Sequence, residues 1–277
     1  MITFEAPRDV KFFLLFLSMK KMDEFISFND LVKLIKTLRA DFSSFSLVLA
    51  SPKGLWKLAQ DEGIGYEVAC THVKESGVLR ITSSYEETET SLTHSEIKML
   101  YSAASAAGLK TTGKAELACP PTGLPLWGAF IDRLVAIRSI ADANSLDVIN
   151  VEPAKETRLT PIEYLRAVGI ARIVLQNVKN VSTPLTRIPS LSPKMGIGTK
   201  YTQHPQEKIA GVCLLAGSND LGLLEEDKVT IASIVEDIRS AGLQPKLRDG
   251  GYEIQSYDSA NIIDRLIHVP NMVVQKK

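Results

Sequence analysis

The sequence predicts an α/β fold in which parallel strands form a partial (β/α) barrel. Strand-like apolar stretches alternate with helix-like amphipathic stretches along the chain. Repeated strand–helix units of this length give parallel strands that are joined by crossover helices. Four or five such units precede Pro153, which is too few for a closed eight-stranded barrel. We therefore expect an open barrel with its functional residues at the carboxyl ends of the strands.

Each predicted strand is a short apolar run that ends at a turn residue or a proline. A proline closes three of these runs, at Pro52, Pro120 and Pro153. Gly77 precedes a fourth run and suits the C-cap of the helix before it. The predicted strands are residues 11–18, 46–50, 78–82, 110–119 and 146–151.

The predicted helices are amphipathic stretches between these strands. In residues 28–39, Leu31, Ile35 and Leu38 share one face, and Asn29 suits the cap. Pro161 favours a helix start, because proline is well tolerated in the first turn. The other predicted helices are residues 53–61, 67–76, 94–107, 127–143, 161–176 and 227–241, with a short one at 261–267 before a basic tail.

Polar residues gather after two of the apolar runs. Ser83, Ser84 and Glu86 follow the run at residues 78–82, and the turn at residues 217–220 follows a nearly uninterrupted apolar run at residues 209–216. We interpret the second run as a buried element that carries Asn219 and Asp220 at its end. The alternative is an ordinary core segment that ends in a cap, since Asn and Asp are common at turns.

Composition restricts the function classes. Lys plus Arg equals Asp plus Glu at 32 each, which argues against non-specific nucleic-acid binding. The three cysteines are odd in number and far apart, which indicates a reducing compartment without a disulfide framework. No apolar run reaches the roughly 20 residues of a membrane span. We expect a cytoplasmic protein with no membrane and no nucleic-acid partner.

Several catalytic motifs are absent from the sequence. The cysteines and the four histidines show no metal-ligand spacing, so a metal site is not expected unless ligands converge from distant loops. There is no phosphate-binding glycine loop and no serine nucleophile elbow. Glu86 is either a site residue or part of a solvated acidic cluster. Arg248 and Asp249 either hold a turn or contribute to a site with Tyr252.

Three segments of the second half together resemble one enzyme family. They are residues 161–180, the segment Gly217-Ser218-Asn219-Asp220-Leu221-Gly222 with Glu225 and Glu226 after it, and residues 238–252 with Arg248, Asp249 and Tyr252. In this order they resemble the radical S-adenosylmethionine enzymes of the futalosine route to menaquinone, aminofutalosine synthase and dehypoxanthine futalosine cyclase. The resemblance runs from about Phe12 to Tyr252. It implies a TIM-like barrel, a [4Fe–4S] cluster, S-adenosylmethionine, and carbon–carbon bond formation or cyclisation.

The chain departs from this family where the cofactor would bind. The family's C-x-x-x-C-x-x-C motif is absent, and the first cysteine is Cys70. A cluster that leaves one iron open for a cofactor needs three thiolates close together. The family's first strand is also missing, since the chain begins near the second. We therefore do not expect this chain alone to hold the cluster.

Three hypotheses remain from the sequence. The chain is a divergent futalosine-pathway enzyme whose cluster-bearing part is elsewhere, a non-catalytic paralogue or partner subunit, or an unrelated small-molecule binder on the same scaffold. A protein partner is expected at the open barrel edge. We expect one structural domain, with the barrel in residues 1–190 and a C-terminal helical and strand extension in 191–277. The candidate cofactor- or substrate-binding residues are Ser83, Ser84, Glu86, Asn219, Asp220, Glu225, Arg248, Asp249 and Tyr252.

Overall fold

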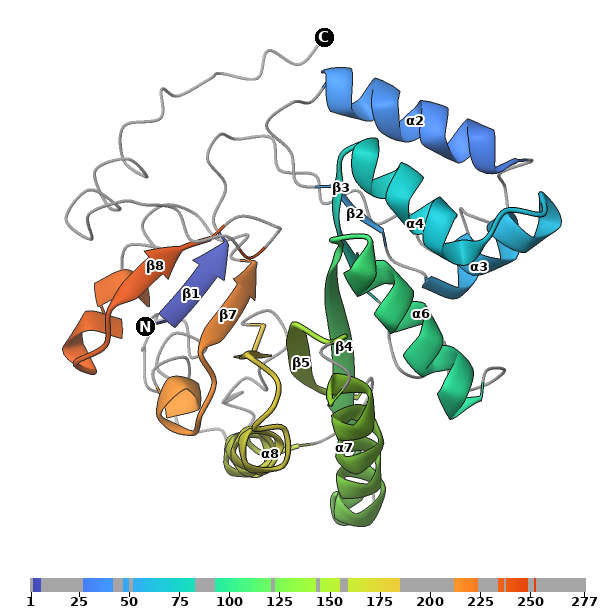
Figure 1. Ribbon diagram of the computed structural model, residues 1–277. Helices are drawn as coiled ribbons and strands as arrows, with labels where there is room; N and C mark the ends of the chain where they lie inside the picture. Colours follow the sequence, from blue (N-terminus) through green and yellow to red (C-terminus); the bar gives the residue numbers. More distant parts are fainter. Residues whose placement is uncertain are drawn as a thin grey trace, which may run out of the picture.

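The strands that the structure describes form one parallel sheet that does not close among these residues. The computed structural model describes residues 2–5, 27–41, 47–49, 52–82, 93–120, 123–142, 145–154, 159–184, 212–223, 234–236, 238–248 and 252. The sheet has eight strands in the order β2-β3-β4-β5-β6-β7-β1-β8 (Figure 1). Within these residues no pairing joins the edge strands β2 and β8. The fold is therefore a partial α/β barrel, as predicted.

The strands agree with the sequence prediction over the first half of the chain. The predicted strand at residues 78–82 has the same bounds in the structure, and the other three that can be compared differ by one to two residues at their ends. The predicted strand at residues 11–18 lies outside the described residues. The strands are β1 (Ile2–Glu5), β2 (Leu47–Leu49), β3 (Val78–Thr82), β4 (Lys110–Leu117), β5 (Val148–Pro153), β6 (Asn180–Ser182), β7 (Asp220–Leu223) and β8 (Pro245–Leu247).

The sequence did not predict β1. This strand lies between β7 and β8, and Thr3 is in register with both Asp220 and Lys246. The first strand of a closed barrel would instead pair with β2, and no described strand takes that position. Among the described residues no strand pairs with the free edge of β2, while β1 lies between β7 and β8.

Helices lie along the right and lower side of the sheet in Figure 1. Two of them begin with a capping box, in which Thr93 pairs with Glu96 and Thr160 with Glu163. None of the helices in the described ranges is both long and apolar enough to cross a bilayer. The helices are α2 (Phe28–Asp41), α3 (Pro52–Asp61), α4 (Tyr66–Glu75), α6 (His94–Ala106), α7 (Trp127–Ala141) and α8 (Pro161–Val174), which confirms the predictions for these segments.

Two apolar cores fill the space between the helices and the sheet. One joins α7 and α8 to the strands from β4 to β7, through residues such as Phe130, Tyr164 and Val151. The other joins α2, α3, α4 and α6 to β2 and β3, through residues such as Leu55 and Ile81. Side chains alternate along a strand, so every second residue faces these cores. The remaining residues form the opposite face, here called the inner face.

The described part of the apolar run at residues 209–216 begins at Val212 and is helical. Residues 212–215 are helical, and the strand follows the polar turn, as β7. Cys213 and Leu214 are buried while Val212 and Leu215 are exposed, which is the burial pattern of a short amphipathic helix. Gly217, at φ +118°, ends it. The turn with Asn219 therefore follows a helical turn and stands at the start of β7, not at the carboxyl end of a strand.

Candidate ligand-binding site

The inner face of the sheet is polar although it is buried. On β4, Ala115 and Leu117 belong to the helix-facing core, so Thr112, Lys114 and Glu116 lie on the inner face. The same alternation places Asn150 and Glu152 on the inner face of β5, Asn180 and Ser182 on that of β6, and Asp220 on that of β7. A buried polar face of this kind needs internal partners or a ligand.

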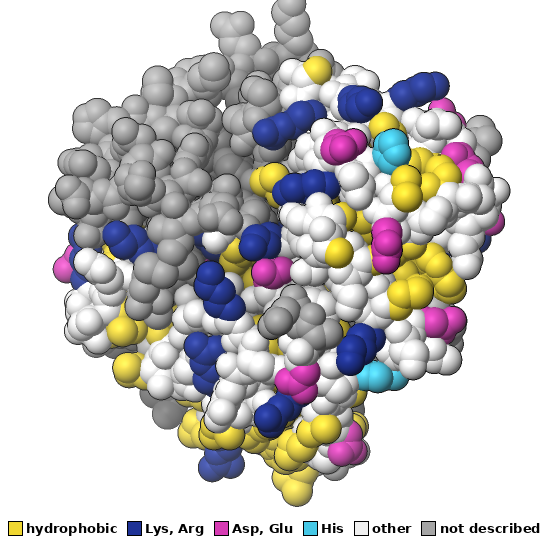
Figure 2. Space-filling view, viewed as in Figure 1, with side chains coloured by type: hydrophobic (Ala, Val, Ile, Leu, Met, Phe, Trp, Pro, Cys, Tyr) yellow, Lys and Arg dark blue, Asp and Glu magenta, His cyan; other side chains and the backbone are white. Residues whose placement is uncertain are grey.

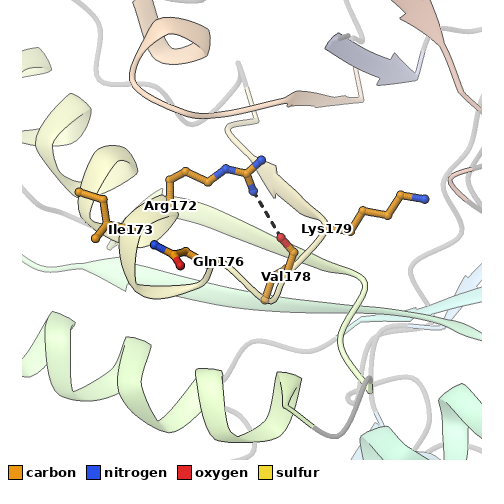
Figure 3. Close-up of a pocket in the computed structure, with 5 residues that line it drawn as sticks. All are labelled: Arg172, Ile173, Gln176, Val178 and Lys179. Atoms are coloured by element: carbon orange, nitrogen blue, oxygen red, sulfur yellow. Dashed lines mark hydrogen bonds between the residues drawn. The ribbon is translucent and has the colours of Figure 1, made fainter.

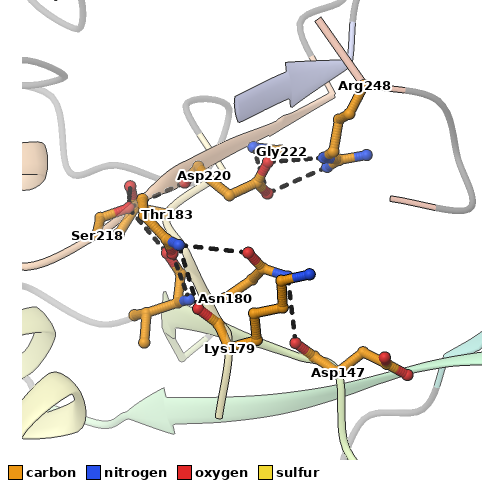
Figure 4. A network of polar contacts seen from close by, with 10 residues as sticks. Asp147, Lys179, Asn180, Thr183, Ser218, Asp220, Gly222 and Arg248 are labelled. Atoms are coloured by element: carbon orange, nitrogen blue, oxygen red, sulfur yellow. Dashed lines mark hydrogen bonds and ion pairs between the residues drawn. The ribbon is translucent and has the colours of Figure 1, made fainter. Parts of the chain in front are cut away.

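Asp220 and Arg248 form a buried ion pair across this face (Figure 4). Arg248 donates from Nε to Asp220 Oδ1 at 2.7 Å and from Nη2 to Oδ2 at 3.1 Å. The backbone N–H of Gly222 also donates to Oδ2, at 3.1 Å. Asp220 is 0% exposed and Arg248 is 3% exposed. Both were candidates from the sequence, and the fold joins them although they lie far apart in the chain.

Tyr252 brings a second arginine to the same place. The guanidinium carbon of Arg248 lies 3.8 Å from the centre of the Tyr252 ring, and that of Arg80 lies 5.3 Å from it. Such cation–π contacts are favourable at these distances. Tyr252 has φ 62°, which is rare for a bulky side chain and costs about 1–3 kcal/mol of backbone strain. Strain of this kind concentrates at functional sites.

Lys114 lies between two glutamates on the inner face. Its ammonium pairs with Glu116, and with Glu152 at 3.3 Å. Burial lowers the pKa of Lys114, but hydrogen bonds and charges of Glu116 and Glu152 outweigh this and raise the pKa above its ordinary value. Lys114 is therefore a protonated cation that holds two carboxylates together across β4 and β5.

Three buried polar atoms of this face have no hydrogen-bond partner among the described residues. They are Arg80 Nε, Thr112 Oγ1 and Ser182 Oγ, and each is also out of contact with solvent. Leaving a buried polar group unsatisfied costs about 1–3 kcal/mol. Most buried polar atoms of folded proteins are satisfied, so a cluster of unsatisfied ones on one face indicates a surface shaped for another molecule.

Asn219 has a local role that the structure makes visible. Its Oδ1 accepts a hydrogen bond from the N–H of Val181 at 2.8 Å, and its Nδ2 donates to the carbonyl of Lys179 at 3.2 Å (Figure 4). These bonds join the start of β7 to β6. A direct part in ligand binding stays a prediction for Asn219, as it does for Ser83, Ser84, Glu86, Glu225 and Asp249, which lie outside the described residues.

Sequence reasoning missed the charged residues inside the strands. It examined only the residues that follow each strand, whereas Arg80, Lys114 and Glu116 lie within β3 and β4. A signal was present in residues 110–117, where polar side chains occupy every second position of a strand that the fold predicts to be buried on both faces. Charges there indicate a polar barrel interior.

The cysteines do not fit an iron–sulfur cluster. Cys70 lies on α4, Cys119 follows β4, and Cys213 lies in the helical turn before β7, and all three are buried. Burial raises the pKa of Cys70 to about 11 and that of Cys213 to about 12. A cluster needs neighbouring thiolates. No group of three metal-ligating side chains occurs among the residues whose positions are described.

An open pocket of about 460 Å³ lies where α8 leads into β6 (Figure 3). It is lined by Arg172, Ile173, Gln176, Val178 and Lys179, and Arg172 Nη1 donates to the carbonyl of Val178 at 3.3 Å. The pocket stands at the amino end of its strand. Ligand sites of parallel barrels lie at the other end, so we place the candidate site on the inner face.

Comparison with known proteins gives one distant sequence relative and several weak structural likenesses. No model of a known protein family matches the chain. The chain is 24% identical over 248 residues to the cyclic dehypoxanthine futalosine synthase of Halalkalibacterium halodurans. The aligned region covers 80% of this chain and 62% of that protein.

The structural likenesses include the tryptophan synthase A-subunit of Pyrococcus furiosus, with 16% identity, a TM-score of 0.41, and coverage of 74% of this chain and 65% of that one. They also include the dihydropteroate synthase (DHPS) of Yersinia pestis with a bound pterine-sulfa conjugate, with 12% identity, a TM-score of 0.42, and coverage of 78% and 76%.

Proposed function

We propose that this chain is a futalosine-type barrel protein of menaquinone biosynthesis that binds a nucleoside-like substrate on the inner face of its sheet. The distant similarity to a cyclic dehypoxanthine futalosine synthase supports the substrate class. The observation that carries the proposal is the buried polar inner face, where Arg80, Thr112 and Ser182 each keep a polar atom that the described residues leave unsatisfied. A substrate rich in hydroxyl and carbonyl groups would satisfy such atoms.

The position of the cysteines favours the non-catalytic alternative for this chain. All three thiols of the sequence are buried on separate elements, so they offer no three-thiolate site for a [4Fe–4S] cluster. We therefore propose a substrate-binding paralogue or partner subunit, with any radical chemistry supplied by a second polypeptide. The open edge of the barrel, at β2, is the proposed place for that partner.

The second candidate function is radical catalysis by a divergent enzyme. The sequence similarity favours it, because the relative is named as a synthase. In that case a cluster on another segment or chain would supply the radical from S-adenosylmethionine. The residues of the inner face would then orient the substrate. The chain spans 62% of the relative's length, so the relative's whole activity is not carried over here.

Two measurements test the proposal. After anaerobic iron–sulfur reconstitution we expect no iron above background, and by titration calorimetry we expect dehypoxanthine futalosine to bind. About four irons per chain, the content of a [4Fe–4S] cluster, would favour the enzyme instead. Failure of both dehypoxanthine futalosine and aminofutalosine to bind would refute the proposed function.

A matched pair of variants locates the binding face. Ser182 and Ser218 are both buried, at 0% and 3% exposure. The hydroxyl of Ser218 bonds to the carbonyl oxygens of Val181 at 3.0 Å and Asp220 at 2.9 Å. The hydroxyl of Ser182 has no hydrogen-bond partner among the described residues. We expect Ser182→Ala to weaken substrate binding without loss of stability, because its hydroxyl makes no bond to the described part of the protein. Ser218→Ala is expected to lower stability by about 1–3 kcal/mol. Unchanged affinity in Ser182→Ala would place the substrate elsewhere.

A further inference from the structure

Arg80 is a buried cation without a counterion among the described residues. Arg80 is 8% exposed and lies on the inner face of β3, with its guanidinium carbon 5.3 Å from the centre of the Tyr252 ring. Within the part of the chain that the structure describes, no carboxylate lies within ion-pair distance of Arg80, and its Nε has no acceptor. A buried charge is costly unless it is paired and hydrogen-bonded. The position therefore needs an explanation.

The neighbouring cations of the same sheet are paired. Arg248 has Asp220 at 2.7 Å, Lys110 has Asp147 at 3.5 Å, and Lys114 has Glu152 at 3.3 Å as well as Glu116. Arg248 and Arg80 even share the ring of Tyr252, yet within the described ranges only Arg248 has a carboxylate. The fold thus neutralises these three cations and leaves positive charge at Arg80.

A second unsatisfied group stands beside Arg80. In the β3–β4 register, Arg80 is opposite Lys110 and Thr82 is opposite Thr112, which makes Arg80 and Thr112 diagonal neighbours on the inner face. Thr112 Oγ1 is buried and has no partner in the described part of the chain. The guanidinium carbon of Arg80 lies 5.3 Å from the centre of the Tyr252 ring, and a guanidinium carries five N–H donors in its plane. A guanidinium edge and a hydroxyl together match an oxyanion.

We propose that Arg80 and Thr112 bind an oxyanion, a carboxylate or a phosphate, that belongs to the ligand of the inner face. Arg80 supplies the charge and paired N–H donors, and Thr112 supplies a hydroxyl donor. The cation–π contact with Tyr252 stabilises the charge of the guanidinium. This inference rests on the proposed function, because it takes the ligand to lie on the inner face of the sheet. It adds that the ligand is anionic.

The test uses Arg80→Met, which keeps an unbranched apolar stem but removes the charged guanidinium, and Thr112→Val, which keeps the shape of the side chain but removes the hydroxyl. Thermal unfolding is measured with added benzoate or inorganic phosphate, each against sodium chloride at the same ionic strength. We expect one of the two anions to raise the unfolding temperature of the unmodified chain, and Arg80→Met to abolish this increase. In Thr112→Val we expect the affinity for the stabilising anion to fall about tenfold or more, because the variant loses a hydrogen bond to a charged group. Benzoate alone indicates a carboxylate subsite, and phosphate alone a phosphate subsite.

Stability without added anion separates a binding role from a structural one. Because Arg80 has no ion-pair partner in the described ranges, we expect Arg80→Met to unfold at the same temperature as the unmodified chain or higher. A matched variant, Arg248→Met, breaks an existing ion pair and is expected to unfold at a lower temperature. A loss of stability in Arg80→Met, or equal anion effects in both chains, would overturn the subsite.

The outcomes also distinguish this inference from the proposed function. If dehypoxanthine futalosine binds equally well to the unmodified chain and to Arg80→Met, the function stands and the subsite fails. If it does not bind at all, while benzoate or phosphate binds in an Arg80-dependent manner, the subsite stands and the substrate assignment fails.

Discussion

Replacement of Asp220 by asparagine tests the importance of the buried ion pair. The asparagine would keep the size of the side chain and an acceptor for the N–H of Gly222, which donates at 3.1 Å. It would remove the charge opposite Arg248, whose Nε lies 2.7 Å from Asp220 Oδ1. The change therefore isolates the electrostatic part of the contact.

The expected loss follows from distance and burial. At 2.7 Å and an effective dielectric constant of about 20, the attraction between two unit charges is about 6 kcal/mol. Desolvation of both ions offsets much of this attraction. When the aspartate charge is removed, the buried arginine keeps its desolvation cost without a partner. We therefore expect Asp220→Asn to lower the free energy of unfolding by about 3–5 kcal/mol. With side-chain exposures of 1% and 0%, the pair is not weakened by solvent screening.

Urea denaturation followed by circular dichroism measures the change in the free energy of unfolding. The control is the double variant Asp220→Asn with Arg248→Met, in which no unpaired charge remains from this pair. We expect the double variant to recover part of the loss, because a buried pair replaced as a whole is often neutral. If Asp220→Asn costs less than about 1 kcal/mol, the value typical of an exposed pair, the reasoning is refuted.

Further expectations concern backbone strain, capping and thiol reactivity. Gly217→Ala places a Cβ 2.8 Å from Arg172 Cγ at φ +118°, so we expect a loss of about 3 kcal/mol. Gly242→Ala, at φ +74° with open space around it, is expected to lose only about 1 kcal/mol, and equal losses would contradict the steric argument. The backbone N–H and hydroxyl of Thr93 lower the pKa of Glu96 below 4.5. Because that pKa is depressed in the folded state, its contribution to stability is full above pH 4.5 and is lost as the pH falls through the folded value. Thr93→Ala keeps the backbone N–H and removes the hydroxyl, so carboxyl titration by NMR should show this pKa rise part of the way toward 4.5, and an unmoved pKa would disprove a contribution of the hydroxyl. Burial raises the pKa of Cys70 to about 11 and that of Cys213 to about 12, so labelling of these two thiols with iodoacetamide at about pH 8 should be slow until the protein is unfolded. Rapid labelling of either thiol in the folded protein would contradict this expectation.

An exposed apolar area on the helices is a separate feature of the surface. Figure 2 shows apolar side chains gathered at the bottom of the view, over α7 and α8. The exposed apolar residues of these helices are Ile131, Val135, Ile162 and Ile173. Single exposed apolar residues are common on soluble proteins, and nothing in the structure identifies an occupant for this area.

The sequence alone determined where most helices and strands of the first half begin and end. Pro161 predicted the start of α8, and the structure adds a capping box of Thr160 and Glu163 at the same place. Strand β3 has its predicted bounds because Gly77, at φ +111°, ends the helix before it. These signals are local, since they act between residues three or four positions apart, and a single sequence contains them in full.

Only the tertiary structure decided which polar groups meet. Asp220 and Arg248 were both candidates, but their contact depends on β1 and the order of the strands in the sheet. Arg80 was missed because the side that faces a core is set by helices that pack from distant parts of the chain. The apolar run before Asn219 was not assigned to helix or strand, because a short apolar segment fits both equally well until its neighbours select one face. The site thus arises from long-range packing, which the order of residues does not by itself reveal.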